Sequence, residues 1–249
     1  MLPLTGKTAL VTGSAQGIGQ AVAAKLARDG AQVALFDINM DQVQLTADNL
    51  AKEGLAVMAG YVDVVSVKSI GDMLEAVVNH FGSLDIVVNN AGILSSTPVQ
   101  QISESEWDKI MAVNLKGTFF VCQQAFQYLK NRPQPRIINL ASLAGRMGGY
   151  ESSLAYTASK GGVISLTYGL SRQYAPYGIT VNSICPGPTE TPMIRQWSDE
   201  QRNGLLAKIP IGKICKPEHI AHTVAYLASD EAEVVTGLAF DINGGLYVG

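Results

Sequence analysis

A tyrosine and a lysine four residues apart, Tyr156 and Lys160, lie in a stretch with helical periodicity, so their side chains share one helix face. A phenol has a pKa of about 10 and is a poor acid or base at neutral pH, but a nearby ammonium group would stabilise the phenolate and lower that pKa. Such a pair suits proton transfer to or from a hydroxyl group. The spacing alone favours a plainer interpretation, a packed tyrosine beside a solvated lysine.

Three glycines, at positions 13, 17 and 19, follow the first expected strand, and a helical stretch begins among them. A diphosphate needs a backbone that it can approach closely and free N–H groups at a helix N-terminus, and these glycines permit both. Their spacing, GxxxGxG, differs from the GxGxxG fingerprint of dinucleotide-binding proteins. A tight strand–helix turn without a ligand is the alternative interpretation.

An acidic residue, Asp37, ends the second expected strand, about twenty residues after the glycine turn. A carboxylate at this place can accept hydrogen bonds from the ribose hydroxyls of adenosine, although an aspartate here also fits an ordinary turn or helix cap. It would repel the 2′-phosphate of NADP, and Ser14, Ala15, Ile38 and Asn39 offer no positive charge to neutralise that phosphate. We therefore predict NAD(H) as the cofactor.

Short apolar runs rich in β-branched residues alternate with longer segments of helical periodicity. We expect strands at 8–12, 32–36, 56–61, 85–89, 136–140, 180–184 and 239–242. We expect helices at 18–29, 40–52, 67–81, 104–113, 117–131, 153–174 and 218–229. Continuous apolar strands are typical of sheets covered on both faces, and the alternation predicts one α/β domain with a doubly wound parallel sheet of about seven strands.

The candidate residues converge on one edge of this sheet. In open parallel sheets ligands bind outside the carboxyl ends of the strands, where the glycine turn, Asp37, Asn90 and Ser142 all lie. Asn114 interrupts the helical stretch that leads into 117–131. Taken singly, Ser142 and Asn114 also fit turn or helix caps.

Composition excludes several functions. Lys and Arg number 18 against 21 Asp and Glu, and this net charge of −3 gives no basic field for a nucleic acid. The three cysteines are far apart and indicate buried thiols in a reducing compartment, while His219 and His222 lack a third ligand nearby, so we expect no metal. No segment is long and apolar enough to span a membrane, and no secretory signal begins the chain. We expect a cytoplasmic protein.

The motifs together resemble the short-chain dehydrogenase/reductase (SDR) family over essentially the whole chain. They are TGSAQGIG at 12–19, Asp63-Val64, NNAG at 89–92, Asn114, Ser142, YTASK at 156–160 and Pro186-Gly187. The resemblance implies a Rossmann-like domain over residues 1–249 with helices on both faces, and hydride transfer between nicotinamide and a carbinol carbon.

The resemblance also implies roles for individual residues. Tyr156 would be the acid/base, Ser142 would hydrogen-bond the substrate oxygen, Lys160 would hold the nicotinamide ribose and lower the pKa of Tyr156, and Asn114 would anchor a relay water. With Tyr156 and Lys160, the residues implied to bind the cofactor are Gly13, Ser14, Gln16, Gly17, Ile18, Gly19, Asp37, Asp63, Val64, Asn90, Ala91, Gly92, Pro186, Gly187, Thr189 and Thr191.

The substrate is less defined. We expect a pocket under a mobile flap, residues 188–210, which fits neither a strand nor a well-packed helix, and its expected lining residues are Leu94, Ser142, Met147, Tyr150, Met193 and Trp197. Arg146 and Arg195 could reach an anionic group or be surface residues. We expect a small or medium secondary alcohol or ketone as substrate.

Two other functions stay open. One is 3-oxoacyl-[acyl-carrier-protein] reductase, an activity that usually accompanies a basic NADPH clamp in the glycine turn, which this chain lacks. The other is a dinucleotide sensor without catalysis, which the complete set Asn114, Ser142, Tyr156 and Lys160 argues against. Gly161 and Gly162 would let another helix approach, and the family pairs the equivalent helices between subunits, so the resemblance implies a homotetramer.

Overall fold

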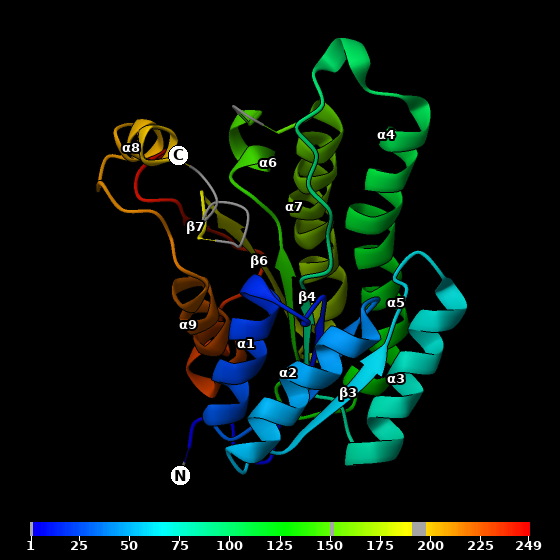
Figure 1. Ribbon diagram of the computed structural model, residues 1–249. Helices are drawn as coiled ribbons and strands as arrows, with labels where there is room; N and C mark the ends of the chain where they lie inside the picture. Colours follow the sequence, from blue (N-terminus) through cyan, green and yellow to red (C-terminus); the bar gives the residue numbers. More distant parts are fainter. Residues whose placement is uncertain (1, 150–151, 191–197) are drawn as a thin grey trace.

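The computed structural model describes residues 2–149, 152–190 and 198–249. Its centre is a seven-stranded sheet in which every strand pair is parallel, in the order β3-β2-β1-β4-β5-β6-β7 (Figure 1). The strands are β1 (Thr8–Thr12), β2 (Gln32–Asp37), β3 (Val57–Tyr61), β4 (Ile86–Asn89), β5 (Arg136–Leu140), β6 (Thr180–Pro186) and β7 (Ala239–Ile242). The order reverses between β1 and β4, as in doubly wound sheets.

Helices cover both faces of the sheet. They are α1 (Gly17–Arg28), α2 (Met40–Lys52), α3 (Val67–Phe81), α4 (Glu104–Met111), α5 (Thr118–Leu129), α6 (Ala144–Met147), α7 (Leu154–Tyr174), α8 (Asp199–Leu206) and α9 (Pro217–Ala228). A π-helix, Ala112–Gly117, joins α4 to α5, and short 3₁₀ turns cover Val99–Gln101, Ala175–Tyr177 and Asp230–Ala232.

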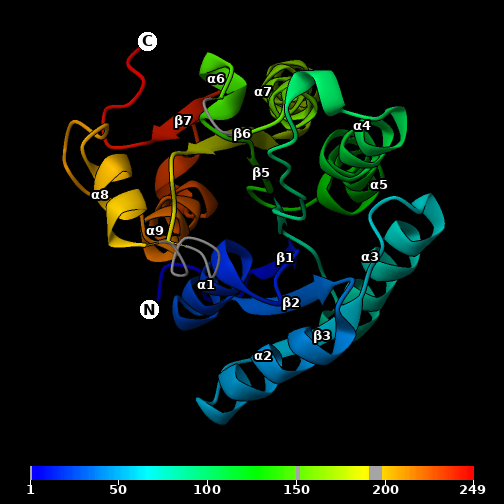
Figure 2. The same cartoon turned by 45° about the horizontal axis from the view of Figure 1, so that its top comes forward.

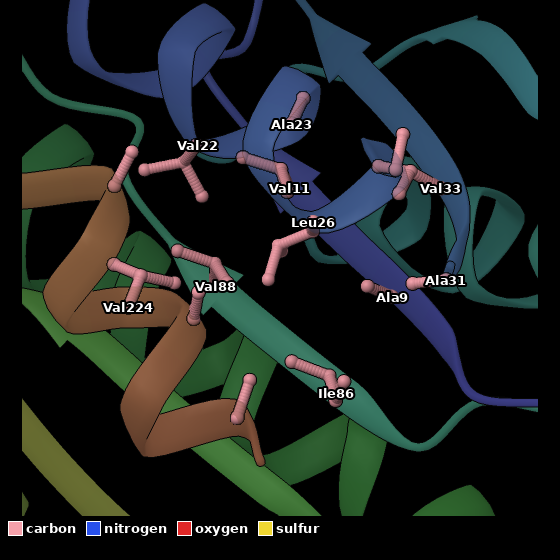
Figure 3. Packing of buried hydrophobic residues seen from close by; sticks show 14 of the residues in the cluster. Ala9, Val11, Val22, Ala23, Leu26, Ala31, Val33, Ile86, Val88 and Val224 are labelled. Atoms are coloured by element: carbon pink, nitrogen blue, oxygen red, sulfur yellow. The ribbon is translucent and has the colours of Figure 1, made fainter. Parts of the chain in front are cut away.

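Two hydrophobic cores hold these layers together. On one face α1, α2 and α9 pack on the sheet, with Val11, Val22, Leu26, Val88 and Val224 close together between α1, α9, β1 and β4 (Figure 3). On the other face α3, α5 and α7 form the second core. The two layers flank the sheet when it is viewed from its carboxyl edge (Figure 2). Strands buried on both faces explain the continuous apolar runs of the sequence.

The predicted elements agree with the observed ones to within a few residues, with three differences. The interruption expected at Asn114 is a π-helix, so the chain stays helical from α4 into α5. A short helix, α6, forms after Ser142, between the expected strand 136–140 and the expected helix 153–174. The expected flap contains the helix α8, in which Arg202, Leu205 and Leu206 are only half-buried, while residues 191–197 lie outside the described part of the chain.

No helix in the described ranges is both long and apolar enough to cross a bilayer.

Candidate active site

The glycine turn between β1 and α1 packs tightly against the end of β4. A Cβ atom added to Gly13 would lie 2.7 Å from the Cα atom of Ala91, and one added to Gly19 would collide with the carbonyl oxygen of Gly13. Gly17 has a φ of +61°, which side chains rarely allow, and nothing lies within 4 Å of the place its Cβ would take. The open space at Gly17, at the N-terminus of α1, fits a diphosphate.

Asn90 fixes this turn. Its Nδ2 atom donates hydrogen bonds to the carbonyl oxygens of Thr12, at 3.1 Å, and Gly13, at 2.7 Å. The hydroxyl of Thr12 accepts from the backbone N–H groups of Asn90 and Ala91, both at 3.2 Å. Asn90 and Ala91 thus join the ends of β1 and β4, and beside them Gly92 is exposed.

Asp37 lies beside the turn as expected. Its Oδ2 atom accepts a 3.0 Å hydrogen bond from the backbone N–H of Ala15, and its Oδ1 atom accepts one of the same length from Asn39. The half-buried carboxylate is therefore held in one orientation at the end of β2. The hydroxyl of Ser14, by contrast, is fully buried and donates to the carbonyl oxygen of Phe36, so the structure does not bring it to the open edge.

At the end of β3, the Oδ1 atom of Asp63 accepts a 2.9 Å hydrogen bond from the backbone N–H of Val65. Val64 is 8% exposed and packs closely against Gly117 of the π-helix. Asp63 is half-buried on the same edge as Asp37. Gln16 is exposed just before α1 begins, and Ile18 is half-buried in its first turn.

Lys160 is buried beneath the open edge. Its Nζ atom donates a 2.6 Å hydrogen bond to the carbonyl oxygen of Leu140, at the end of β5, and lies 5.8 Å from the centre of the Tyr156 ring. Burial lowers the pKa of Lys160 to about 8. The ammonium group is directed at the backbone of β5 in this structure.

Tyr156 on α7 and Ser142 after β5 lie close to each other at this edge of the sheet. Burial raises the pKa of the Tyr156 phenol, and the hydrogen bond with Ser142 acts in the opposite direction. In this structure the desolvation of the phenol outweighs the effect of Ser142, and the lowering of this pKa by Lys160 stays a prediction. Ser142 itself accepts a 3.1 Å hydrogen bond from the backbone N–H of Ala144.

Asn114 is fully buried in the π-helix, and its side-chain amide hydrogen-bonds to other groups of the protein. Its Oδ1 atom accepts from the backbone N–H of Ile93 at 2.8 Å, and its Nδ2 atom donates to the carbonyl oxygen of Ile93 and to the hydroxyl of Ser159. Ser159 in turn donates to the carbonyl oxygen of Tyr156 at 2.7 Å. The amide braces the chain after β4 and the turn of α7 that carries Tyr156, and both of its N–H groups have protein partners, while the expected relay water stays a prediction.

The chain after β6 closes the edge. A Cβ atom on Gly187 would lie 2.8 Å from the Cα atom of Asn243, and Thr189, which is 6% exposed, donates to the carbonyl oxygen of Gly187 at 2.9 Å. Pro186 is the last residue of β6. Thr191 lies outside the described residues.

Comparisons with known proteins agree with this geometry. A family model described as Enoyl-(Acyl carrier protein) reductase matches residues 13–247. The chain is 39% identical to the 3-oxoacyl-[acyl-carrier-protein] reductase FabG of Vibrio cholerae, over 98% of this chain and 99% of that protein. It is also 39% identical to FabG of Escherichia coli, over 98% of each chain. The chain belongs to the short-chain dehydrogenase/reductase family.

Solved structures agree with this assignment. A dehydrogenase/reductase from Sinorhizobium meliloti 1021 superposes with a TM-score of 0.94 at 35% identity, covering 99% of this chain and 97% of that one. The crystal structure of gox2181 gives the same TM-score at 30% identity, covering 98% and 97%. As an SDR, the chain is an oxidoreductase of a family that binds a nicotinamide dinucleotide. The names of the two FabG relatives match the 3-oxoacyl reductase interpretation better than that of a simple alcohol dehydrogenase.

Two of the residues expected to line the substrate pocket, besides Ser142, lie in the described part of the chain. Leu94 is 54% exposed on the chain after β4, and Met147 is half-buried on α6. The other expected lining residues, Tyr150, Met193 and Trp197, lie outside the described residues, as does Arg195.

Arg146, for which the sequence left both an anionic-group contact and a surface position open, pairs with groups of the chain itself. Its Nη2 atom pairs with Asp241 at 3.0 Å and donates to the carbonyl oxygen of Ala239 at 2.7 Å, and its guanidinium also stacks on the ring of Tyr247. These contacts tie α6 to β7.

Gly161 and Gly162 do not provide a bare surface for a second subunit. A Cβ atom on Gly145 of α6 would lie 2.6 Å from the carbonyl carbon of Lys160, and one on Gly162 would lie 2.7 Å from Leu115. Elements of the same chain approach here, and the homotetramer stays a prediction from the resemblance.

The remaining chemistry-bearing residues are structural. Cys122, Cys185 and Cys215 are buried free thiols, as expected. The Nδ1 atom of His219 accepts from the backbone N–H of Lys216 at the start of α9, and the described residues hold no group that could bind a metal ion. Sequence reasoning missed Ser159, although its place three residues after Tyr156 was a usable signal.

Proposed function

We propose that this protein interconverts a ketone and a secondary alcohol, with Tyr156 as the group that gives or takes the hydroxyl proton. The observation that carries the proposal is the meeting of Tyr156, Ser142 and buried Lys160 at the edge that also holds the glycine turn. The bound dinucleotide supplies or accepts the hydride. The residues of the chain bind the substrate and the dinucleotide, orient them and transfer the proton.

Each residue has a distinct task in this proposal. Ser142 hydrogen-bonds the substrate oxygen beside Tyr156, so that the oxygen lies within reach of the phenol. Lys160 holds the nicotinamide ribose, and its positive charge stabilises the phenolate when Tyr156 has lost its proton. Asn114 keeps the start of α7 and the chain after β4 at a fixed distance through Ser159 and Ile93.

The proposed cofactor is NAD(H). Asp37 would accept hydrogen bonds from the adenosine ribose, and its charge disfavours a 2′-phosphate. Asp63 and Val64 would contact the adenine, and the backbone from 13 to 19 the diphosphate. The nicotinamide would lie against Gly92 and Gly187, with Pro186, Thr189 and Thr191 completing its site.

The names of the relatives support a 3-oxoacyl thioester as the first substrate to test, with a small or medium secondary alcohol or ketone as the second. Both substrate classes undergo the same proton and hydride transfer. They differ in the molecule that occupies the pocket, and the proposed chemistry is the same for either. We also propose that residues 1–249 form one catalytic domain in which residues 188–210 cover the substrate. The protein would be a cytoplasmic homotetramer. Size-exclusion chromatography with light scattering tests the tetramer.

The deciding experiment follows the absorbance of reduced cofactor with two panels. Acetoacetyl thioesters are offered with NADH or NADPH, and secondary alcohols, diols and hydroxy acids with NAD⁺ or NADP⁺. The proposal expects turnover with NAD(H) in at least one panel and its loss in Tyr156→Phe. Tight NADH binding without turnover in either panel would instead support a dinucleotide sensor.

A further inference from the structure

The loop that follows β4 is held at two points beside the proposed active site. The first is Ile93, whose backbone N–H and carbonyl both bond to the Asn114 amide. The second is Ser95, whose hydroxyl donates a short hydrogen bond to the carboxylate of Glu106, a residue of α4. The residue between these two anchors, Leu94, is therefore held from both sides.

Ser95 also holds the beginning of the catalytic helix. Its carbonyl oxygen accepts a 2.7 Å hydrogen bond from the backbone N–H of Ser153, which is 2% exposed. Ser153 is the N-cap of α7, and its hydroxyl accepts from the backbone N–H of Tyr156 at 3.3 Å. Three successive hydrogen bonds thus lead from the Glu106 carboxylate to the backbone of Tyr156.

The local sequence predicts another partner for Glu106. Ser103 caps α4 and accepts from the backbone N–H of Glu106 at 3.1 Å, and a Ser-x-x-Glu pattern of this kind usually returns the glutamate side chain to the N-cap backbone. In this structure the carboxylate accepts from Ser95, across the gap to the loop. A hydrogen bond to an ionised carboxylate is stronger than one between neutral groups, so it adds to the hydrogen bonds that Ser95 makes with Thr97 and Ser153 in holding the loop.

We propose that Glu106 is a positioning residue of the active site. It acts through Ser95 and Ser153 to hold the first turn of α7, and with it Tyr156, and to present Leu94 to the substrate. Leu94 is 54% exposed between the two anchors, as a residue that contacts a substrate must be. This inference rests on the proposed function, in which Tyr156 is the proton donor.

The chain supplies a matched control on the same helix. Glu104 is exposed and shares the first turn of α4 with Glu106, so both carboxylates interact with the helix N-terminus in the same way. Glu104→Ala and Glu106→Ala therefore remove the same charge from the same turn. Only Glu106→Ala removes the contact with Ser95, while Glu106→Gln keeps an oxygen that can accept it.

The kinetic test compares the three variants with the wild type on the substrate found in the screen. We expect Glu106→Ala to lower kcat/KM about tenfold, since the loss of one hydrogen bond to a charged group is of that order, with the Kd of NADH unchanged. Glu106→Gln should recover most of the loss, and Glu104→Ala should match the wild type. Equal kcat/KM values in Glu106→Ala and Glu104→Ala would overturn the proposal.

A second readout is independent of turnover and separates this inference from the proposed function. Amide hydrogen exchange is measured over Ser153–Tyr156 by mass spectrometry. Faster exchange in Glu106→Ala, with wild-type exchange in Glu104→Ala, is expected even if no substrate is found, and unchanged exchange overturns the positioning role. If Glu106→Ala fails to fold, Ser95→Ala removes the donor of the same hydrogen bond. Its kcat/KM and its hydrogen exchange over Ser153–Tyr156 are then compared with those of Glu104→Ala.

Discussion

The amide of Asn114 hydrogen-bonds to both backbone groups of Ile93, accepting at 2.8 Å and donating at 3.0 Å. The contact joins the π-helix Ala112–Gly117 to the chain after β4, and a third hydrogen bond continues it to Ser159 on α7. A π-turn inside an α-helix often marks a functional site, because it moves one residue out of the regular register. Here it places a buried amide between two segments of the active site.

Replacing Asn114 with alanine should lower both stability and turnover. The N–H and carbonyl groups of Ile93 and the hydroxyl of Ser159 lose a buried partner, which costs about 1–3 kcal/mol of unfolding free energy for each group left unsatisfied. Urea unfolding and kcat measure the two effects. Asn49→Ala, at an exposed position of α2, is the control and should change neither. Wild-type kcat in folded Asn114→Ala would contradict the bracing role.

Replacing Tyr156 with phenylalanine removes one hydroxyl and little else. Because general acid–base catalysis contributes about 10²–10⁴-fold to a rate, we expect kcat to fall by at least that much while the Kd of NADH stays within about twofold. Steady-state kinetics and fluorescence titration with NADH measure the two quantities. Tyr177→Phe, at a half-exposed tyrosine outside the candidate site, should behave as the wild type.

The buried Lys160 should make stability depend on pH. Its pKa falls from 10.5 in an exposed lysine to about 8 in the folded chain, so between these pH values the unfolded chain binds more protons than the folded one. The unfolding free energy therefore rises with pH through this window, by up to about 3 kcal/mol, and the gain is lost as pH falls through 8. The buried Cys122 opposes this above pH 9, because burial raises its pKa to about 12.

Comparison with Lys160→Met isolates the lysine, since Cys122 titrates in both proteins. The variant also loses the hydrogen bond to Leu140, which shifts its stability by an amount that does not depend on pH. Urea unfolding of both proteins at several values between pH 7 and 10 should give a stability difference that grows with pH in favour of the wild type. A constant difference would show that Lys160 keeps its proton over this range.

Much of the fold could be predicted from the sequence because parallel strands and amphipathic helices leave strong local patterns. Strand β5 matches its predicted bounds, and Asp37 lies where the pattern placed it. Contacts between distant residues could not be predicted. Arg146 pairs with Asp241, 95 positions further along the chain, and Gly145 of α6 packs against the backbone of Lys160. The sequence pattern around Ser95 and Glu106 likewise gives no sign that they meet.

Asp37 provides the sharpest test of the cofactor. Its carboxylate is held by the N–H groups of Ala15 and Asn39, so it cannot easily turn away from a 2′-phosphate. Asp37→Asn removes the charge and keeps one oxygen acceptor, and two unit charges about 4 Å apart repel by up to about 4 kcal/mol near a protein surface. The ratio of kcat/KM for NADPH to that for NADH should therefore rise at least tenfold.

Asp41→Asn is the matched control for this prediction, because Asp41 is an exposed acid in the first turn of α2 and its loss changes the net charge equally. If the general negative field of the chain disfavoured NADPH, both variants would shift the ratio alike. A shift confined to Asp37→Asn locates the discrimination at the end of β2. A wild type that already prefers NADPH would instead mean that the ribose lies beyond the reach of Asp37, and the NAD(H) assignment would be wrong.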